Sequence, residues 1–274
     1  MENNTTIGQN LSPYGARRIG AINWLGVWTL YKKEIHRFLK VMGQTVLSPI
    51  VTTILFMTIF TIALGGSRRY AGDIPFDLFL APGLVIMAVL QNAFANTTSS
   101  LMTSKMHGNI VDLIMAPLGP GEITLAFTMA AVTRAMLVAG FVILSMLFFV
   151  QLTFPNLWAL FYFGFSAAVM LAFLGIIAGI WAEKWEQSSS ITNFVIVPLS
   201  FLSGTFYSIE RLPGIWHSVS QLNPFFYLID GFRYGIIDRA DGNLVTGVIY
   251  VAVLNIILGL TCYRMFSSGY KLRP

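Results

Sequence analysis

The sequence predicts an all-α integral membrane protein with six transmembrane helices, and two observations support this prediction. Of the 274 residues, 55% are hydrophobic and only 11% are charged, which is less than half the charged share of an ordinary soluble domain. The charges are also separated by apolar stretches, each long enough for the roughly 20 residues that cross a bilayer as a helix. So few charges cannot cover a water-facing surface, so the apolar excess must face lipid.

The expected spans come from stretches that lack Lys, Arg, Asp and Glu. One uncharged run, 135–182, is too long for a single helix, and we divide it at the turn Thr153-Phe154-Pro155-Asn156. Within a transmembrane domain of residues 43–266, the expected spans are 45–65, 78–99, 130–152, 157–181, 189–208 and 243–263.

Residues 211–235 are apolar but interrupted, because Pro213, Asn223 and Pro224 break any continuous helix. We expect a pair of short re-entrant helices at the outer face, shielded by protein or facing a wet cavity. The alternative is a seventh crossing, which would move the C-terminus to the opposite side.

Basic residues orient the protein through the positive-inside rule. With six spans, the polar tail 1–20, the segment before the first span, the loops after spans 2 and 4 and the tail 267–274 share one side. That side carries 11 Lys and Arg residues, and the other carries 5. Both termini are therefore expected in the cytoplasm. Arg134, near the expected start of span 3, is expected to reach the inner interface.

Residues 21–42 predict an amphipathic helix lying at the membrane surface. Trp24, Trp28 and Tyr31 fall on one helical face, and most of the basic residues fall on the other. Two interpretations stay open: a surface anchor only, or an anchor whose polar face also docks a cytoplasmic partner.

Several function classes are disfavoured. The chain has no G-x-x-x-x-G-K-[ST] motif, so we expect no ATP or Mg²⁺ bound by this chain. It has no clustered Cys and His ligands, so we expect no metal site. No Asp or Glu lies within the expected spans, which counts against proton- or sodium-coupled carriers and against a membrane hydrolase. The net charge of +5 is explained by membrane orientation, so we expect no nucleic-acid partner.

Two loops and their neighbours are similar to a known family. The first loop is Lys105-Met-His-Gly-Asn-Ile-Val-Asp112-Leu-Ile-Met-Ala-Pro117, and the second runs from Phe206 through Asn223-Pro224-Phe-Phe-Tyr227 to Arg233. With the segment Lys33–Arg37 and the pair Asn92 and Asn96, they resemble the ABC-2 type permease family, and within it the YadH-like inner-membrane permeases. The resemblance covers nearly the whole chain from about Trp24 onward.

The resemblance implies a multi-pass plasma (inner) membrane subunit of an exporter, working as a homodimer with a separate ABC ATPase that binds ATP and Mg²⁺. It implies a short cytoplasmic coupling helix at 105–117 that docks into the ATPase, and an outer re-entrant segment that closes the exit path. This chain departs from the acidic pair that is frequent in the coupling loop of the family, because Val111 precedes Asp112. The implied ATPase-coupling candidates are Glu34, Arg37, His107, Asn109, Asp112 and Pro117.

Candidates for the pathway and its outer closure follow from position. Asn92 and Asn96 share a helix face, and they either line the pathway or bridge helices by hydrogen bonds. Phe201, Phe206 and Tyr207 form an apolar gate or pack as ordinary aromatics. The outer re-entrant candidates are Pro213, Asn223, Pro224, Asp230 and Arg233. The competing function is a secondary transporter or channel that works without an ATPase.

Overall fold

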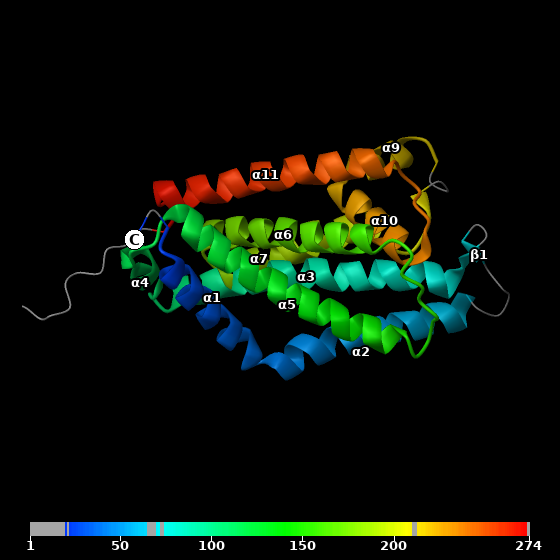
Figure 1. Cartoon of the computed structure of the whole chain (residues 1–274), viewed down its shortest axis with the longest axis horizontal. Coiled ribbons are helices and arrows are strands. Elements are labelled where there is room, and N and C mark those ends of the chain that lie inside the picture. The colour runs from blue at the N-terminus through cyan, green and yellow to red at the C-terminus, as the bar shows by residue number, and fades with distance from the viewer. Residues whose placement is uncertain (1–19, 21, 65–69, 72–73, 210–212, 273–274) are drawn as a thin grey trace, which may run out of the picture.

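The computed structural model describes residues 20, 22–64, 70–71, 74–209 and 213–272. Most of the predicted tail 1–20, the loop with Arg68 and Arg69, the start of the predicted re-entrant segment at Arg211 and the last two residues lie outside this range. The helices run along one long axis, as Figure 1 shows. The elements are α1 (Trp24–Leu39), α2 (Met42–Leu64), β1 (Tyr70–Ala71), β2 (Ile74–Pro75), α3 (Phe76–Met106), α4 (Ile110–Met115), α5 (Pro120–Met146), α6 (Leu157–Trp181), α7 (Trp185–Ile191), a π-helix (Thr192–Ile196), α8 (Val197–Leu202), α9 (Ile215–Leu222), α10 (Pro224–Ile237) and α11 (Leu244–Ser268).

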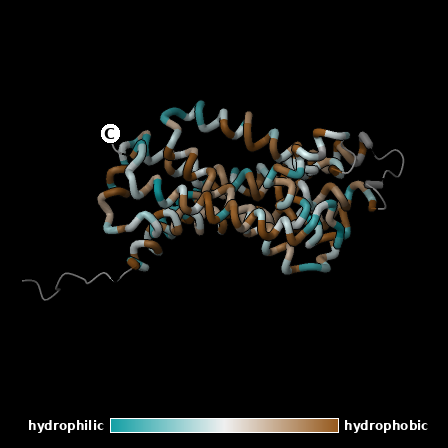
Figure 2. The backbone as a smooth tube through the Cα atoms, turned by 90° about the horizontal axis from the view of Figure 1, so that it is seen from above, coloured by the Kyte–Doolittle hydropathy of each residue, from teal (hydrophilic) through white to brown (hydrophobic). Residues whose placement is uncertain are grey.

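Among the described residues, five helices are long and apolar enough to cross a membrane: α2, α3, α5, α6 and α11. Their burial differs widely. In the most apolar stretch of α3, 83% of the residues are buried inside the bundle, against 22% in α2 and 11% in α11. Thus α3 is central and α2 and α11 are peripheral. Figure 2 shows hydrophobic residues through the middle of the bundle, with hydrophilic segments mostly toward its ends and edges.

The centre of the bundle is the contact between α3 and α6, which small residues make possible. A Cβ atom on Gly175 would clash with the Thr97 hydroxyl and the Phe94 carbonyl. Thr97 and Thr98 use this proximity to donate hydrogen bonds to the carbonyls of Ala172 and Gly175, at 3.0 and 3.1 Å. Close backbone approach with interhelical hydroxyl bonds is a usual packing mode in lipid.

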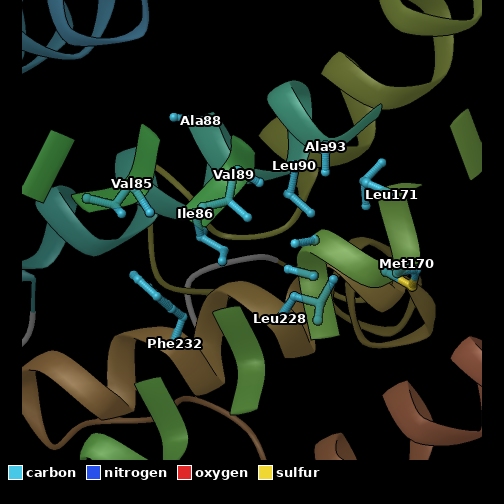
Figure 3. Close-up of a cluster of buried hydrophobic side chains, with 14 of the residues drawn as sticks. Val85, Ile86, Ala88, Val89, Leu90, Ala93, Met170, Leu171, Leu228 and Phe232 are labelled. Carbon is cyan, nitrogen blue, oxygen red and sulfur yellow. The ribbon is translucent and has the colours of Figure 1, made fainter. Parts of the chain in front are cut away.

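Around this contact lies the main apolar core, to which α3, α6 and α10 contribute. Figure 3 shows side chains from these helices gathered in one cluster: Val85, Ile86, Ala88, Val89, Leu90, Ala93, Met170, Leu171, Leu228 and Phe232. The cluster fixes α10 against the two central helices, so α10 is part of the bundle and not a surface loop.

The fifth expected span, 189–208, is not one regular helix. The chain is helical without interruption from Trp185 to Leu202, but its middle turn is π-helical, and Val197 N donates to Thr192 O. Pro198 explains the wide turn, because its ring has no N–H and would clash with the carbonyl four residues back. This segment is therefore not among the five long helices.

The helix that contains the third expected span begins before that span does. This helix is α5, which begins at Pro120, whereas the expected span begins at residue 130. Proline at the first position and Glu122 in the first turn are both favourable helix-start residues. The charge-free search missed this start because Arg134 and Glu122 lie inside the helix.

The two short helices expected in the outer segment are present. The helix α9 has 8 residues and α10 has 14, so neither reaches the ~20 residues of a full crossing. They lie near the end of the bundle that carries β1, while α4, the beginning of α1 and the end of α11 lie together at the other end (Figure 1).

The helix α1 corrects the expected orientation of the amphipathic segment. Trp24 and Trp28 are exposed, at 64% and 59%, as an interfacial helix requires. The face packed on the bundle, however, is the one with Val27, Leu30, Glu34 and Phe38. Glu34 is the unexpected member of this buried face, because a charged residue of an amphipathic helix is expected to face water.

Candidate functional site

A polar groove lies between α2, α3 and α5. It encloses about 430 Å³, and most of its wall from α2 consists of hydroxyl and amide side chains. The residues that line it are Val41, Gln44, Thr45, Ser48, Pro49, Thr52, Thr53, Phe56, Leu84, Met87, Ala88, Gln91, Asn92, Ala95, Ser99 and Arg134. Because it holds an ionisable residue, Arg134, between membrane-spanning helices, we take this groove as the candidate functional site.

The inner half of this groove is bounded by what we call the arginine cluster: Glu34, Arg37, Asn92, Asn96 and Arg134. The side-chain oxygen of Asn96 accepts from both guanidinium groups, from Arg37 at 2.9 Å and from Arg134 at 3.4 Å. Asn92 accepts from Arg134 at 3.2 Å. Three helices, α1, α3 and α5, therefore meet at two amide side chains.

The two arginines differ in their charge partners. Arg37 Nε donates to Glu34 Oε2 at 2.9 Å, and its terminal nitrogens also reach Ser99 Oγ and the Asn96 carbonyl. Arg134 has only the two amide oxygens, and its buried Nε has no hydrogen-bond partner in the described part of the chain. The cluster thus holds one carboxylate and two guanidinium groups.

These contacts correct one expectation and place two further candidates. Arg134 is the fifteenth residue of the 27-residue helix α5 and points to Asn92 and Asn96, so it does not reach the inner interface. Glu34 is 1% exposed, the Arg37 side chain is 29% exposed, and the two pair with each other. Arg37 is also bonded to Asn96 of α3. The ATPase contact predicted for these two residues stays a prediction.

Asn92 and Asn96 make the interhelical hydrogen bonds that were one of the alternatives predicted for them, and the pathway alternative stays a prediction. Each bridges helices by accepting from Arg134, and Asn92 also lines the groove. Arg134 is the residue that the sequence analysis failed to assign to this site. Its signal was available, since an arginine four turns into an apolar helix is unlikely to be left facing lipid.

A cluster of aromatic rings lies beside Phe56 in the wall of the groove. Phe56 lines the groove and lies 5.9 Å, centroid to centroid, from Phe206, which stacks on Phe201 at 4.9 Å. Phe60 lies 5.1 Å from Phe206. The Tyr207 hydroxyl donates to the Leu202 carbonyl. The predicted gate residues therefore lie together, and α2 supplies the rings that face them.

The outer candidates form a separate and well-bonded group. Asp230 and Arg233 face each other at 3.8 Å with side chains 3% and 1% exposed. The pair is therefore buried and not a surface pair. Asp230 also accepts from the backbone N–H groups of Asp241 and Gly242. Arg233 donates to the Gly204 carbonyl and lies 3.9 Å above the Phe79 ring.

Asn223 and Pro224 begin α10, as their residue types favour. The Asn223 side chain accepts from Phe225 N at 3.1 Å and donates to Ser203 Oγ and to the Leu199 carbonyl. It therefore ties α10 to the end of α8. Pro213 is exposed ahead of α9 and contributes no side-chain bond.

At the opposite end, four predicted coupling residues lie around α4. His107, Asn109, Asp112 and Pro117 are all exposed. The helix buries Ile110 and Leu113 against the bundle and leaves apolar side chains outward, including Met115 at 79% exposed. The result is a short helix that is fixed on one face and free on the other.

The carboxylate of Glu122 takes part in the hydrogen bonds that join the loop after α4 to α1 and α5. Glu122 at the start of α5 accepts from Asn23 N at 2.5 Å and from Gly119 N at 2.7 Å. Asn23 caps α1 and donates to the Pro117 carbonyl at 3.0 Å. The loop after α4 and the first turns of α1 and α5 are therefore bonded into one unit, which the sequence analysis did not predict.

At the same end of the bundle, two lysines from other parts of the chain donate hydrogen bonds to the C-terminus of α6. Lys105 donates to the carbonyls of Ile180 and Ala182, and Lys271 donates to the Trp181 carbonyl and to Glu183 at 2.8 Å. Cations at this position complement the helix dipole. The hydrogen bond from Lys271 lowers the pKa of Glu183, and the same bond raises the pKa of Lys271.

A second cavity, of about 850 Å³, lies between α5, α6, α10 and α11. Its wall is almost entirely apolar, and Ser166 and Asn255 are its polar members apart from the Tyr162 hydroxyl. It therefore lacks the polar wall of the groove. Across the described ranges, no cluster of three or more His, Cys, Asp or Glu has the geometry of a metal site.

Comparison with known proteins decides the family. The profile of the ABC-2 type transporter family matches residues 26–237. The chain belongs to the ABC-2 type transporter family. The inner membrane transport permease YadH of Escherichia coli strain K12 is 32% identical over 250 residues, which is 91% of this chain and 98% of YadH. Nodulation protein J of Rhizobium leguminosarum bv. trifolii is 24% identical over 219 residues, covering 78% of this chain and 81% of that protein.

The groove and α4 both lie within the family match, which extends from α1 to the end of α10. The chain is a multi-pass membrane protein and a permease subunit of the ABC exporter type. The predicted resemblance to the ABC-2 permeases, and to the YadH-like members among them, is confirmed.

Proposed function

We propose that this chain forms the transmembrane route of an exporter whose ATP, with Mg²⁺, is bound and hydrolysed by a separate ABC ATPase. The observation that carries the proposal is α4, a helix held to the bundle on one side and apolar and exposed on the other. Met115 at 79%, Val111 at 43% and Ile114 at 41% exposed form an apolar surface next to Asp112. Depletion of charge at such a patch is usual for the core of a protein–protein interface.

The connections of α4 suggest how a push is transmitted. Glu122 and Asn23 bond the loop after α4 to α1 and α5. Farther along α1, Arg37 is bonded to Asn96 of α3, and Tyr31 is bonded to Thr133 of α5 at 3.0 Å. Closure of the ATPase against α4 would therefore move α1 and α5 together and change the width of the groove at Arg134.

The topology that we propose has six crossings, with both termini in the cytoplasm of an inner (plasma) membrane. The helical run 185–202 serves as the sixth crossing, because 18 residues span ~27 Å, close to the ~30 Å hydrocarbon thickness. The proposed working unit is a homodimer in which α2 faces the second copy. Leu47, Val51 and Leu55 are each more than half exposed on that helix and support this arrangement. The surrounding surface contacts membrane lipids.

The proposal is tested by co-purification with a co-expressed ABC ATPase and by vanadate-sensitive hydrolysis. Met115→Asp should abolish co-purification and stimulation of hydrolysis, since it places a charge in the proposed apolar contact. Ile215→Asp is the matched control, because Ile215 is equally exposed, at 80%, and lies on α9 at the other end. Unchanged binding in the Met115 variant, or cargo transport in vesicles without any ATPase, would contradict the proposal and favour a secondary transporter or channel.

A further inference from the structure

Arg134 carries a charge that the chain itself does not neutralise. It lies at the middle of α5, with about 21 Å of helix on its N-terminal side. Its hydrogen bonds go to two neutral amides at 3.2 and 3.4 Å, both longer than the usual distance for a charged pair. A cation at this depth is costly unless it is paired, and so it usually marks the path of a substrate or ion.

No carboxylate in the described part of the chain is available to it. Glu34, the acid in the same cluster, is already bonded to Arg37 at 2.9 Å. Asp230 pairs with Arg233, Glu183 pairs with Lys271, and Glu122 accepts two backbone N–H groups. The remaining described acids lie near the ends of the bundle, at positions 77, 112, 186, 238 and 241.

The arginine cluster places Arg134 in the wall of the groove and gives it hydrogen bonds to amides but no charged partner. Asn92 and Asn96 hold one side of the guanidinium, and Arg134 itself forms part of the groove wall. A planar guanidinium with free donors is well matched to an oxyanion, which it binds through two parallel hydrogen bonds.

The rest of the groove has two kinds of wall. Around Arg134 it offers Gln91, Asn92 and Ser99, and toward the outer end it offers Phe56, Leu84 and Met87. A ligand that satisfies both has an oxyanion head near Arg134 and an apolar part toward the aromatic rings. Because α2 is peripheral, this groove lies at the edge of the bundle, between α2 and the central helix α3.

We propose that the groove binds an anionic amphiphile, with its phosphate or carboxylate on Arg134. That the ligand is the exported cargo rests on the proposed function, whereas the binding itself requires no ATPase. The two are therefore separable: binding is measured on the purified full chain, and coupling is measured by ATP hydrolysis with the partner.

The test is a titration of the chain's thermal unfolding in a neutral maltoside detergent with dodecyl phosphate. Dodecanol tests the apolar part alone, and inorganic phosphate tests the anion alone. The wild-type chain should gain a saturable increase in Tm with dodecyl phosphate and a much smaller increase with either half. Arg134→Gln should weaken the apparent affinity at least about tenfold, as expected for a lost charged contact.

Two further variants make the result decisive. Arg134→Lys keeps the charge and should retain a large part of the affinity, even if Arg134→Gln folds poorly. Arg264→Gln is the matched control, because Arg264 is exposed on α11 and is not part of the groove; its titration should equal that of the wild type. Equal shifts in wild type and Arg134→Gln, or equal shifts with dodecanol and dodecyl phosphate, would overturn the proposal. A shift with inorganic phosphate alone would assign the site to a free anion and overturn its amphiphile part.

Discussion

Two arginines inside the same bundle have opposite surroundings. Arg233, on α10 at the outer end, is 1% exposed and has a carboxylate, a backbone carbonyl and an aromatic ring as partners. Arg134, in the middle of α5, is open to a polar groove and has only two long contacts to amides. Arg233 therefore has a carboxylate partner within the chain, whereas Arg134 has only amide partners among the described residues. The Nε atom of each is buried without a hydrogen-bond partner among the described groups.

The difference separates structural from functional charge in a membrane protein. A buried pair of opposite charges fixes the packing of the elements that carry it, here α10 and the loop around Gly204. A half-satisfied cation stores a cost that a ligand can remove. We therefore expect mutations at the two arginines to affect different measurements.

The largest expected effect comes from Asp230→Asn. It leaves Arg233 buried without its carboxylate, and removal of one partner of a buried pair costs about 3–5 kcal/mol. Unfolding of the purified chain in mild detergent, followed by tryptophan fluorescence, measures the loss. Asp112→Asn is the control, since Asp112 is exposed on α4, and an equal loss in both variants would argue that the outer pair is not special.

A smaller effect is expected from Glu122→Ala, which tests whether the inner end behaves like the Arg233 region. The substitution removes the acceptor of the Asn23 and Gly119 N–H groups, and loss of a helix cap costs about 0.5–2 kcal/mol. It should also lower ATPase stimulation, because α4 loses a connection to α1 and α5. Glu186→Ala changes a first-turn glutamate of α7 that is exposed, and it should leave both values unchanged.

A change of less than about 1 kcal/mol is expected from Arg134→Met. Replacement of an incompletely paired buried charge by an apolar residue of similar length is often neutral or stabilising. The same denaturation experiment on Arg233→Met should show a clear loss. Equal destabilisation by the two substitutions would mean that Arg134 is a structural residue and would remove the distinction drawn above.

The smallest effect is expected from the exposed pair Glu183 and Lys271. The bond lowers the pKa of Glu183 below its ordinary value of 4.5 and raises that of Lys271 above 10.5. Its contribution is therefore present between these values, is lost as the pH falls through the lowered pKa of Glu183, and is lost again as the pH rises through the raised pKa of Lys271. The Tm difference between wild type and Glu183→Gln should vanish at both extremes, and a difference independent of pH would contradict this assignment.

Much of the fold was readable from the distribution of charge. The turn at Thr153–Asn156 was placed correctly, and α6 begins at Leu157 directly after it. The sequence analysis failed where charges lie inside a helix. Because Glu122 and Arg134 lie inside α5, the search for charge-free stretches missed the first half of this helix. The search also did not predict that the helix between Trp185 and Leu202 has a π-helical turn before Pro198. Local rules locate apolar runs, but they do not reveal which charge has a partner on a distant helix.

The candidate site was only partly predictable for the same reason. The residues around α4 follow from one contiguous motif, and the structure does place His107, Asn109, Asp112 and Pro117 together. The arginine cluster joins positions that are up to 100 residues apart, from Glu34 to Arg134, and depends on how α1 packs on α3 and α5. The resemblance assigned Glu34 and Arg37 to an ATPase contact, and the local pattern gives no sign of the pair that they form or of the bond from Arg37 to Asn96.

The most direct test of the whole account is whether the groove is a water-accessible route. Thr52 lines the groove on α2, whereas its neighbour Val51 is 62% exposed, does not line the groove and lies on the face that we propose to contact the second copy. With the buried Cys262 left in place, Thr52→Cys in cells should react with a small water-soluble thiol reagent, and Val51→Cys should not. Dodecyl phosphate should slow the reaction at position 52. Equal reactivity at both positions, or none at position 52, would contradict the claim that this groove carries the cargo.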